Sequence, residues 1–418
     1  MKIRLDGMAG GVVRNVARLS LVALAACCVA GGAHAQISDG VVKIGLLTDM
    51  SGAFSQFSGQ GSVVAAQMAI DDCQARECKG MKIELLTADH QNKTDIALAK
   101  AREWADVNHV DAFADMVNSA VALAMQNLAV QKGKAALFAG GPLRISNEDC
   151  QPEYAVQWMW DTYSQTAAAI KGLAKPKQSW YFVTVDYAYG NAAVAEARKQ
   201  LDAIGARTVG ESKHPLNSSD MSSQIIAAQQ SNADVVAFAN SGADSANAIK
   251  TAQEFQLGAK QIQAAFFPTI YEIKGIGLAQ AKGLRFPESF YWDIDDGTRR
   301  FSKRFMDIYK KGPPSLTHAG VYSSVYHYLK AVSASHSDDA RTVIKKMHEL
   351  PIQDDVVRNP KLRPDGRMVH DYYYFHVKTP QESKGPWDLY TLEKTLPGDQ
   401  VFLPISESQC RVFKTAAR

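Results

Sequence analysis

The chain has 418 residues and a formal net charge of +3. Its first 35 residues carry four basic residues and one acid, so subtracting 35 from 418 leaves 383 residues with a formal net charge of zero. A neutral chain without a basic run excludes a binding surface for nucleic acid or for anionic lipid. A length of 383 residues is enough for two domains of about 100–200 residues each.

The first 35 residues have the pattern of an export signal. An apolar run occupies residues 19–32 and is followed by Ala33-His34-Ala35. Four basic residues precede the run: Lys2, Arg4, Arg14 and Arg18. This pattern predicts a signal peptide over residues 1–35 that is cleaved after Ala35, since the run is shorter than the ~20 residues of a membrane span. A second interpretation is a lipid anchor at Cys27, because residues 24–27 (LAAC) resemble a lipobox. Either way the protein is exported.

Four cysteines follow the signal sequence: Cys73, Cys78, Cys150 and Cys410. An even number of cysteines in an oxidising compartment predicts disulfides, and we favour Cys73 with Cys78 and Cys150 with Cys410. Free buried thiols are the alternative. We expect no metal site, because neither pair has Cys-x2-Cys spacing or a nearby histidine pair.

Short apolar runs alternate with stretches of helical period, which predicts an α/β fold. In the first half we expect strands at residues 41–48, 81–87, 110–116 and 135–139, with helices at 62–70, 96–107 and 120–130. A second series gives strands at 180–185, 208–212, 235–239 and 262–267, with helices at 192–204, 222–230 and 246–255. The pattern therefore predicts two doubly wound parallel-sheet lobes, with residues 140–152 as the first link between them.

The last third returns to helices at residues 300–309, 319–332 and 341–349. A β-hairpin is expected around Pro364-Asp365-Gly366, with residues 372–377 as the returning strand. Late elements must pack on an existing lobe, so we expect a hinge of several crossings. The predicted boundaries are 36–157 with 293–365 for lobe 1, 158–292 with 366–395 for lobe 2, and 396–418 for a C-terminal tail.

Three strand ends carry residues suited to binding a small anion. The loop at residues 48–61 is rich in glycine and serine, which let backbone N–H groups face an anion at a helix N-terminus. It is neither a Walker loop nor a Gly-x-Gly-x-x-Gly dinucleotide fingerprint. Ser119 follows the third strand and is expected to cap the next helix. The segment 186–190 (DYAYG) places an acid and two aromatic residues after a strand; a turn or a solvent-facing loop is the alternative in each case.

Four segments in order resemble periplasmic leucine/isoleucine/valine-type binding proteins: residues 42–52 (VKIGLLTDMSG), 56–59 (QFSG), 186–190 (DYAYG) and 319–326 (AGVYSSVY). The resemblance covers nearly the whole mature chain. It implies a type I periplasmic binding fold, no catalysis, no cofactor, and a monomer that delivers a small molecule to the permease subunits of an ABC importer. No nucleophile elbow, His-Glu-x-x-His helix or phosphate loop supports an enzyme. A sensory ligand-binding protein is the remaining alternative.

The resemblance also implies a set of binding residues. Asn118, Ser119 and Gly141 would hold the ligand carboxylate. Aromatic side chains would close over the ligand, although each could instead belong to a core: Phe57, Tyr163, Tyr189, Tyr291 and Trp292. Asp186 and Ser241, at strand ends of the second lobe, complete the predicted set.

One departure from the family bears on the ligand. Amino-acid binders of this family pair the ligand ammonium with an acid at the end of the strand that here reads AAFFPT, residues 264–269. No acid stands there, although Asp244 and Glu272 are near in sequence. Without such a partner an ammonium would be buried unpaired, which costs several kcal/mol. We therefore favour an aromatic carboxylate, with a branched-chain or other amino acid as the alternative.

Overall fold

The computed structural model describes residues 37–414, which belong to one compact unit, Ile37–Arg418. The predicted signal peptide and the lipid-anchor position Cys27 lie outside the described residues. No helix in residues 37–414 has both the length and the apolar character that crossing a bilayer requires.

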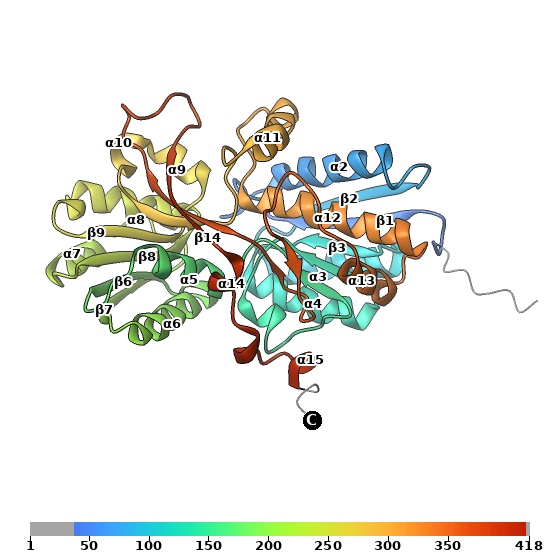
Figure 1. Cartoon of the computed structure of the whole chain (residues 1–418), viewed down its shortest axis with the longest axis horizontal. Helices are drawn as coiled ribbons and strands as arrows, with labels where there is room; N and C mark the ends of the chain where they lie inside the picture. Colours follow the sequence, from blue (N-terminus) through green and yellow to red (C-terminus); the bar gives the residue numbers. More distant parts are fainter. Residues whose placement is uncertain (1–36, 415–418) are drawn as a thin grey trace, which may run out of the picture. The chain divides into compact units, whose positions relative to one another are not determined.

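The first part of the chain forms a five-stranded parallel sheet in the order β2-β1-β3-β4-β5 (Figure 1). Its strands are β1 (Val42–Thr48), β2 (Ile83–Asp89), β3 (Ala112–Asp115), β4 (Ala135–Phe138) and β5 (Ala155–Gln157). In β1 every residue except Lys43 is buried. Helices cover both faces of such a sheet, which explains why its strands read as apolar runs rather than as alternating patterns.

Helices from two distant parts of the sequence pack on this sheet, or on its helix α2 in the case of α11, and complete what we call the first lobe. They are α2 (Gly59–Ala75), α3 (Thr94–Glu103) with a π-helical turn (Trp104–Asn108), α4 (Ser119–Lys132), α11 (Asp296–Tyr309), α12 (Leu316–Ser335) and α13 (Ala340–Glu349). The nearly all-buried α12 packs against α2. A Cβ on Gly61 of α2 would lie 2.2 Å from Nε2 of His318, so glycine is what allows these helices to approach.

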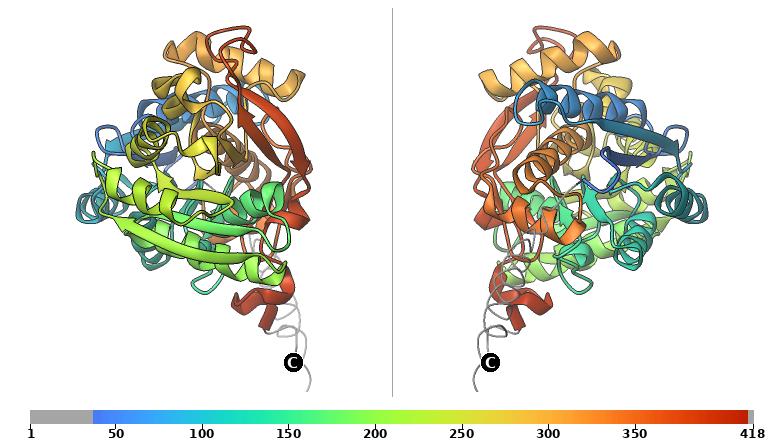
Figure 2. Two further views of the ribbon diagram at one scale, coloured as in Figure 1. Left: turned by 90° about the vertical axis from the view of Figure 1, so that its left-hand side faces the viewer. Right: turned by 90° about the vertical axis from the view of Figure 1, so that its right-hand side faces the viewer.

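The second lobe is built on a seven-stranded mixed sheet in the order β14-β13-β10-β9-β8-β6-β7. Its parallel strands are β6 (Ser179–Val185), β7 (Arg207–His214), β8 (Val235–Ser241), β9 (Ile262–Phe267) and β10 (Arg285–Glu288), joined by the antiparallel β13 (Tyr372–Val377) and β14 (Tyr390–Leu396). Its helices are α5 (Thr162–Leu173), α6 (Ala188–Ala203), α7 (Ser222–Gln230), α8 (Ala243–Glu254), α9 (Ile270–Ile276) and α10 (Leu278–Ala281). Figure 2 shows β13 and β14, in red, along one edge of this sheet. The predicted α/β class with two parallel-stranded lobes is confirmed.

The prediction for the late hairpin was wrong in its second strand. The turn at Gly366 joins two short strands, β11 (Lys361–Leu362) and β12 (Met368–Val369). Residues 372–377 are β13, which pairs with β10 and β14 instead. The apolar run of β13 fits a buried position inside a sheet, which a two-stranded hairpin cannot supply.

The predicted first link was also misplaced. Residues 140–152 contain a 3-10 turn (Leu143–Ser146), and the chain then adds the unpredicted β5 to the first sheet. The crossing to the second lobe follows at residues 158–161. The chain crosses again at 289–295 and at 363–371, so the hinge has three crossings. The strands β5 and β10 are only three and four residues long, which is too short to give a periodic signal.

The structure has both disulfides that the sequence analysis favoured. Cys73 and Cys78 close a local turn at the end of α2, with Cα atoms 5.0 Å apart. Cys150 and Cys410, 260 residues apart in sequence, join the segment before β5 to the C-terminal tail. No group of three or more metal-ligating side chains occurs in the described part of the chain.

Candidate functional site

The carboxyl ends of the parallel strands of both lobes face one another, as expected for ligand sites in open α/β sheets. The loop after β1 reaches the second lobe: a Cβ on Gly242, after β8, would lie 2.8 Å from the carbonyl oxygen of Ala53. The ring of Phe57 lies 5.6 Å from that of Phe267, at the end of β9. The two lobes therefore touch at these strand ends, and we call the region between the strand ends the cleft.

The loop after β1 is held in shape by its own polar groups. The Asp49 carboxylate accepts hydrogen bonds from the backbone N–H of Gly52 (2.6 Å) and of Phe54 (2.9 Å). The Thr48 hydroxyl accepts one from the N–H of Gly59 (2.6 Å), whose φ of +57° favours glycine. Asp49 therefore shapes the loop, and the loop in turn places the buried ring of Phe57 in the cleft.

At the end of β3 the structure corrects the predicted cap. The Asn118 side-chain oxygen accepts hydrogen bonds from the N–H of Ala120 (2.8 Å) and of Val121 (3.0 Å), so Asn118, not Ser119, caps α4. Ser119 is the first residue of the helix and is buried. Gly141, after β4, has a φ of +150°, a conformation that side chains disfavour. All three lie at the strand ends of the first lobe.

Four aromatic rings from both lobes and the hinge meet in the cleft. Phe267 lies at their centre, with ring centroids 4.6 Å from Trp160, 5.6 Å from Phe57 and 6.0 Å from Tyr189. All four side chains are at most 4% exposed. We call this set the aromatic cluster. Trp160 can lie there because residue 140 is glycine: a Cβ on Gly140 would be 2.1 Å from the indole.

The aromatic cluster carries two polar atoms that have no partner among the described residues. They are the indole Nε1 of Trp160 and the hydroxyl of Tyr189, both buried. An indole N–H can only donate. Burial holds the pKa of Tyr189 well above its usual value, so its hydroxyl stays protonated and can also donate. A buried donor without a partner costs about 1–3 kcal/mol, so this arrangement suits a ligand that brings hydrogen-bond acceptors.

The sequence analysis missed Trp160 and Phe267. Trp160 lies on the first crossing, directly after a strand that was too short to predict, and Phe267 was read only as the end of a strand. Phe57 and Tyr189 were predicted, and the structure brings both into the aromatic cluster. The signal that could have found Trp160 is the pair of glycines at 140–141, which leaves room for a large ring above the end of β4.

The other predicted aromatic residues lie elsewhere. The Tyr291 ring packs in the core of the second lobe, 4.8 Å from Tyr390, and Trp292 donates its N–H to the carbonyl oxygen of Trp387 (2.9 Å). Trp292 lines a separate pocket of about 490 Å³ with Trp387 and Met306. Tyr163 is half-buried on α5, and burial raises its pKa to about 12. Neither Tyr291 nor Trp292 joins the aromatic cluster, because Tyr291 packs on β13 and β14 and Trp292 bonds to the loop between these strands.

Of the two predicted polar residues of the second lobe, Asp186 and Ser241, only Ser241 lies near the aromatic cluster. Asp186 is exposed and pairs with Lys213 at 3.4 Å, which places it on the surface. Ser241 is buried at the end of β8, with its hydroxyl 3.4 Å from that of Tyr187. Tyr187 in turn lies 6.2 Å from Tyr189, ring to ring. Ser241 is therefore close to the aromatic cluster and Asp186 is not.

Both acids near residues 264–269 are engaged within the second lobe. The Glu272 carboxylate caps α9 by accepting hydrogen bonds from the N–H (2.6 Å) and the hydroxyl of Thr269. Asp244 accepts one from the N–H of Asn217 (3.0 Å). Burial raises the pKa of both carboxyls. The end of β9 itself, Phe267-Pro268-Thr269, presents no carboxylate to the cleft.

A second pocket lies between the loop after β1 and the second lobe. A pocket of about 330 Å³ is bounded by the loop after β1, at Gly52–Gln56, and by α8 and α9 of the second lobe. Its polar lining includes Gln56, Asn247, Lys250, Tyr271 and the acid Glu272, whose carboxylate is already bonded to Thr269. Because its walls come from both lobes, this pocket is a candidate entrance to the cleft.

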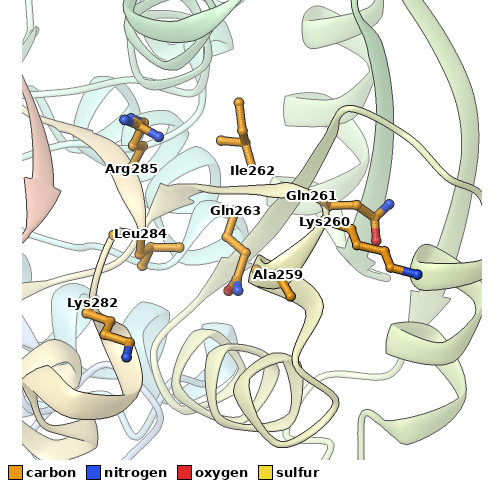
Figure 3. A pocket seen from close by; sticks show the side chains of 10 residues that line it. Ala259, Lys260, Gln261, Ile262, Gln263, Lys282, Leu284 and Arg285 are labelled. Carbon is orange, nitrogen blue, oxygen red and sulfur yellow. The ribbon is translucent and has the colours of Figure 1, made fainter.

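A third pocket, of about 320 Å³, lies at the amino ends of β9 and β10, away from the cleft (Figure 3). Three cations line it: Lys260, Lys282 and Arg285. In Figure 3 their side chains point in different directions, and the Arg285 guanidinium lies 3.4 Å from Glu393. Charges that diverge do not form a site for one anion.

Comparison with known proteins assigns the family. A family model described as periplasmic binding protein matches residues 41–386. The chain belongs to the periplasmic binding protein family, which is non-enzymatic. No curated protein matched the chain.

Solved structures support the same assignment. A periplasmic binding protein from Burkholderia mallei is 38% identical, with a TM-score of 0.84 over 90% of this chain and 99% of that one. A branched-chain amino acid ABC transporter periplasmic ligand-binding protein from Burkholderia xenovorans is 37% identical, with a TM-score of 0.81 over 89% of this chain and 100% of that one. An ABC transporter solute-binding protein from Rhodopseudomonas palustris, solved with benzoate, is 18% identical (TM-score 0.76; 89% and 100% covered) and shares the fold alone.

Proposed function

We propose that this protein captures a small carboxylate, with an aromatic acid favoured, between its two lobes and delivers it to an ABC importer from the periplasm. The observation that carries the proposal is the aromatic cluster with its two unpartnered donors, Trp160 Nε1 and the Tyr189 hydroxyl. Flat rings suit an aromatic body, and two donors suit carboxylate or hydroxyl oxygens.

The charge of the cleft separates this ligand from an α-amino acid. An amino acid would bring an ammonium group next to the end of β9, where Glu272 and Asp244 are already bonded to the backbone. A buried charge without a partner costs several kcal/mol, whereas an aromatic acid brings no cation. Asn118, Ser119 and Gly141 would then face the carboxylate from the first lobe, with Ser241 on the opposite wall.

Binding of the ligand would favour closure of the lobes about the three crossings. We propose lobe boundaries of 36–157 with 293–365 and 158–292 with 366–395, so that the cleft lies between them. A ligand that contacts both lobes binds the closed state more tightly and shifts the population toward it. The closed form, acting as a monomer, would present both lobes to the permease subunits.

A branched-chain amino acid is the second candidate ligand, because the 37% identical relative is described as a periplasmic ligand-binding protein of a branched-chain amino acid ABC transporter. The two candidates differ by the ammonium group, so they can be separated directly. Leucine and benzoate share a carboxylate and an apolar body of similar size. Only leucine requires an anionic partner in the cleft.

A thermal-shift screen of the mature protein tests the proposal. Benzoate, 4-hydroxybenzoate, leucine and an aliphatic dicarboxylate are compared, since a ligand at about 100 times its Kd stabilises the native state by about 2.7 kcal/mol. We expect the aromatic acids to raise Tm by about 3 °C and leucine to have no effect. A Tm rise with leucine alone would support the amino-acid candidate and refute the argument from the missing ammonium partner.

Two substitutions test the donors themselves. Tyr189→Phe and Trp160→Phe keep an aromatic ring and remove the hydrogen-bond donor. Each is expected to weaken binding of the effective aromatic acid by about tenfold or more, as for a charge-assisted hydrogen bond. Tyr291→Phe is the matched control, because its hydroxyl bonds to Trp387 within the second lobe. Equal loss in all three variants would contradict the proposed role of the aromatic cluster.

A further inference from the structure

The C-terminal tail, residues 397–414, returns from the second lobe to the first across the hinge. After β14 the chain forms the short helix α14 (Gly398–Val401), which packs on α5 (Figure 1). Val401 and Phe402 are at most 2% exposed. Cys410 then forms the disulfide with Cys150 of the first lobe. The tail is therefore a fourth connection between the lobes, closed by a covalent bond.

The tail covers the place where two of the crossings are bonded to each other. The N–H of Gln157, the last residue of β5 before the first crossing, donates to the carbonyl oxygen of Gly366 on the third crossing (2.9 Å). Arg367 on the third crossing pairs through Nε with Asp161 on the first (3.0 Å). Its Nη1 donates to the carbonyl oxygen of Trp160 (3.3 Å). The backbone of Trp160 is thus fixed by Arg367.

Phe402 supplies a further contact of that cation. The Arg367 guanidinium is 1% exposed and lies 4.4 Å from the centroid of the Phe402 ring. A buried cation needs compensation from every side, and a ring face contributes more when it is desolvated. Asp161 contacts Arg367 from the crossing, and Phe402 contacts it from the tail. Removing the ring would leave the cation partly uncompensated and free to shift.

The side chain of Trp160 extends from this point into the aromatic cluster, where it lies 4.6 Å from Phe267. A continuous path of contacts therefore runs from Phe402 through Arg367 to Trp160 and its indole in the aromatic cluster. We propose that the C-terminal tail is part of the ligand-binding apparatus: Phe402 and Arg367 are positioning residues for Trp160, and the Cys150–Cys410 disulfide holds the tail on the hinge. The ligand contact of Trp160 rests on the proposed function, whereas the positioning does not.

The test compares variants of the mature protein without added ligand. Phe402→Leu removes the ring and keeps both disulfides, and Leu403→Ala is its matched control, because it removes apolar surface from the neighbouring tail residue and leaves the ring. The double variant Cys150→Ser/Cys410→Ser releases the tail, and Cys73→Ser/Cys78→Ser is the control for losing a disulfide. Hydrogen exchange is followed in peptides that cover residues 157–162 and 363–372.

A second readout reports on the indole of Trp160 alone. The fluorescence of each variant is compared with that of the same variant carrying Trp160→Phe, and the difference spectrum gives the Trp160 emission. We expect Phe402→Leu and the Cys150/Cys410 variant to show exchange at least about tenfold faster in both crossing peptides and a red-shifted Trp160 emission. Both controls should resemble the wild type in the two crossings.

Wild-type exchange and emission in Phe402→Leu would overturn the proposal, as would equal effects in Phe402→Leu and Leu403→Ala, which would mean that the tail contributes only apolar packing. If the double cysteine variant does not fold, Phe402→Leu decides alone. Benzoate affinity is then measured by calorimetry and should fall about tenfold with Phe402→Leu. Should benzoate fail to bind even the wild type, the proposed ligand class fails, while the exchange and fluorescence results still decide the positioning role.

Discussion

Replacing Gly140 by alanine tests whether Trp160 must occupy the cleft. A Cβ at this position would lie 2.1 Å from the indole, whereas ordinary contacts begin at 3.4 Å, so the ring must move by more than 1 Å. Gly140 has no positive φ, so the backbone accepts a side chain without strain. The substitution therefore creates a steric clash with one side chain, that of Trp160.

The magnitude follows from the closeness of the packing. Overpacking of a core typically costs about 1–3 kcal/mol, and the displaced indole also loses its contact with Phe267. We expect Gly140→Ala to lower the free energy of unfolding by about 2 kcal/mol in urea titrations. Binding of the aromatic acid found by the thermal-shift screen should fall by at least about tenfold, measured by calorimetry.

Gly385→Ala is the control for this prediction, because a Cβ there meets no atom within 4 Å and its φ is not positive. It should leave both the stability and the affinity unchanged. If Gly140→Ala binds the ligand as tightly as the wild type, the indole does not form part of the binding surface. Unchanged stability in Gly140→Ala would instead show that Trp160 moves freely, which contradicts the packing described above.

Three further predictions concern the supporting structure. Glu272→Ala should destabilise the fold by about 1 kcal/mol through loss of the α9 cap and leave ligand affinity unchanged, so a large loss of affinity would identify Glu272 as a ligand partner. Burial holds the pKa of three histidines at about 4: His318, His327 and His370. Each histidine stays neutral in the folded protein but is protonated below about pH 6.5 in the unfolded chain, so stability is lost as the pH falls from 6.5 to 4. The loss is about 2 kcal/mol per histidine at pH 4.5. In urea titrations at pH 7 and 4.5, His318→Gln should therefore lose less stability between the two pH values than the wild type does. By loop length, removing the Cys150–Cys410 disulfide should cost about 3 kcal/mol more than removing the Cys73–Cys78 disulfide, and calorimetric unfolding of the two serine double variants would refute this if their losses were equal.

Two buried carboxyls affect the pH dependence of stability in the direction opposite to the histidines. Burial raises the pKa of Asp115 to about 7 and that of Asp111 to about 6, so these carboxyls bind protons more readily in the folded state. Their effect on stability is favourable as the pH falls through this range, opposite to that of the histidines. The difference between wild type and His318→Gln isolates the histidine, because both proteins retain the two acids.

Much of the fold was determined by local sequence. Fully buried strands such as β1 and β8 leave continuous apolar runs, and helices such as α7 leave a periodic pattern, so residues 222–230 were predicted with their observed bounds. The cysteines also carried information through their even number, and the structure has the favoured pairs. These features depend on neighbours in the chain, which is why a sequence read alone could find them.

The candidate ligand site was decided by tertiary structure. Phe57 and Tyr189 could be predicted because they lie in segments with a recognisable pattern, the loop after β1 and the start of α6. Trp160 becomes a cleft residue only when the first crossing passes over Gly140. Tyr291 and Trp292 have similar aromatic character and end in the second lobe, because pairing of β10 with β13 turns them away from the cleft. The apolar character of an aromatic side chain favours its burial. Contacts between segments far apart in sequence determine whether the ring is buried in a core or in the cleft.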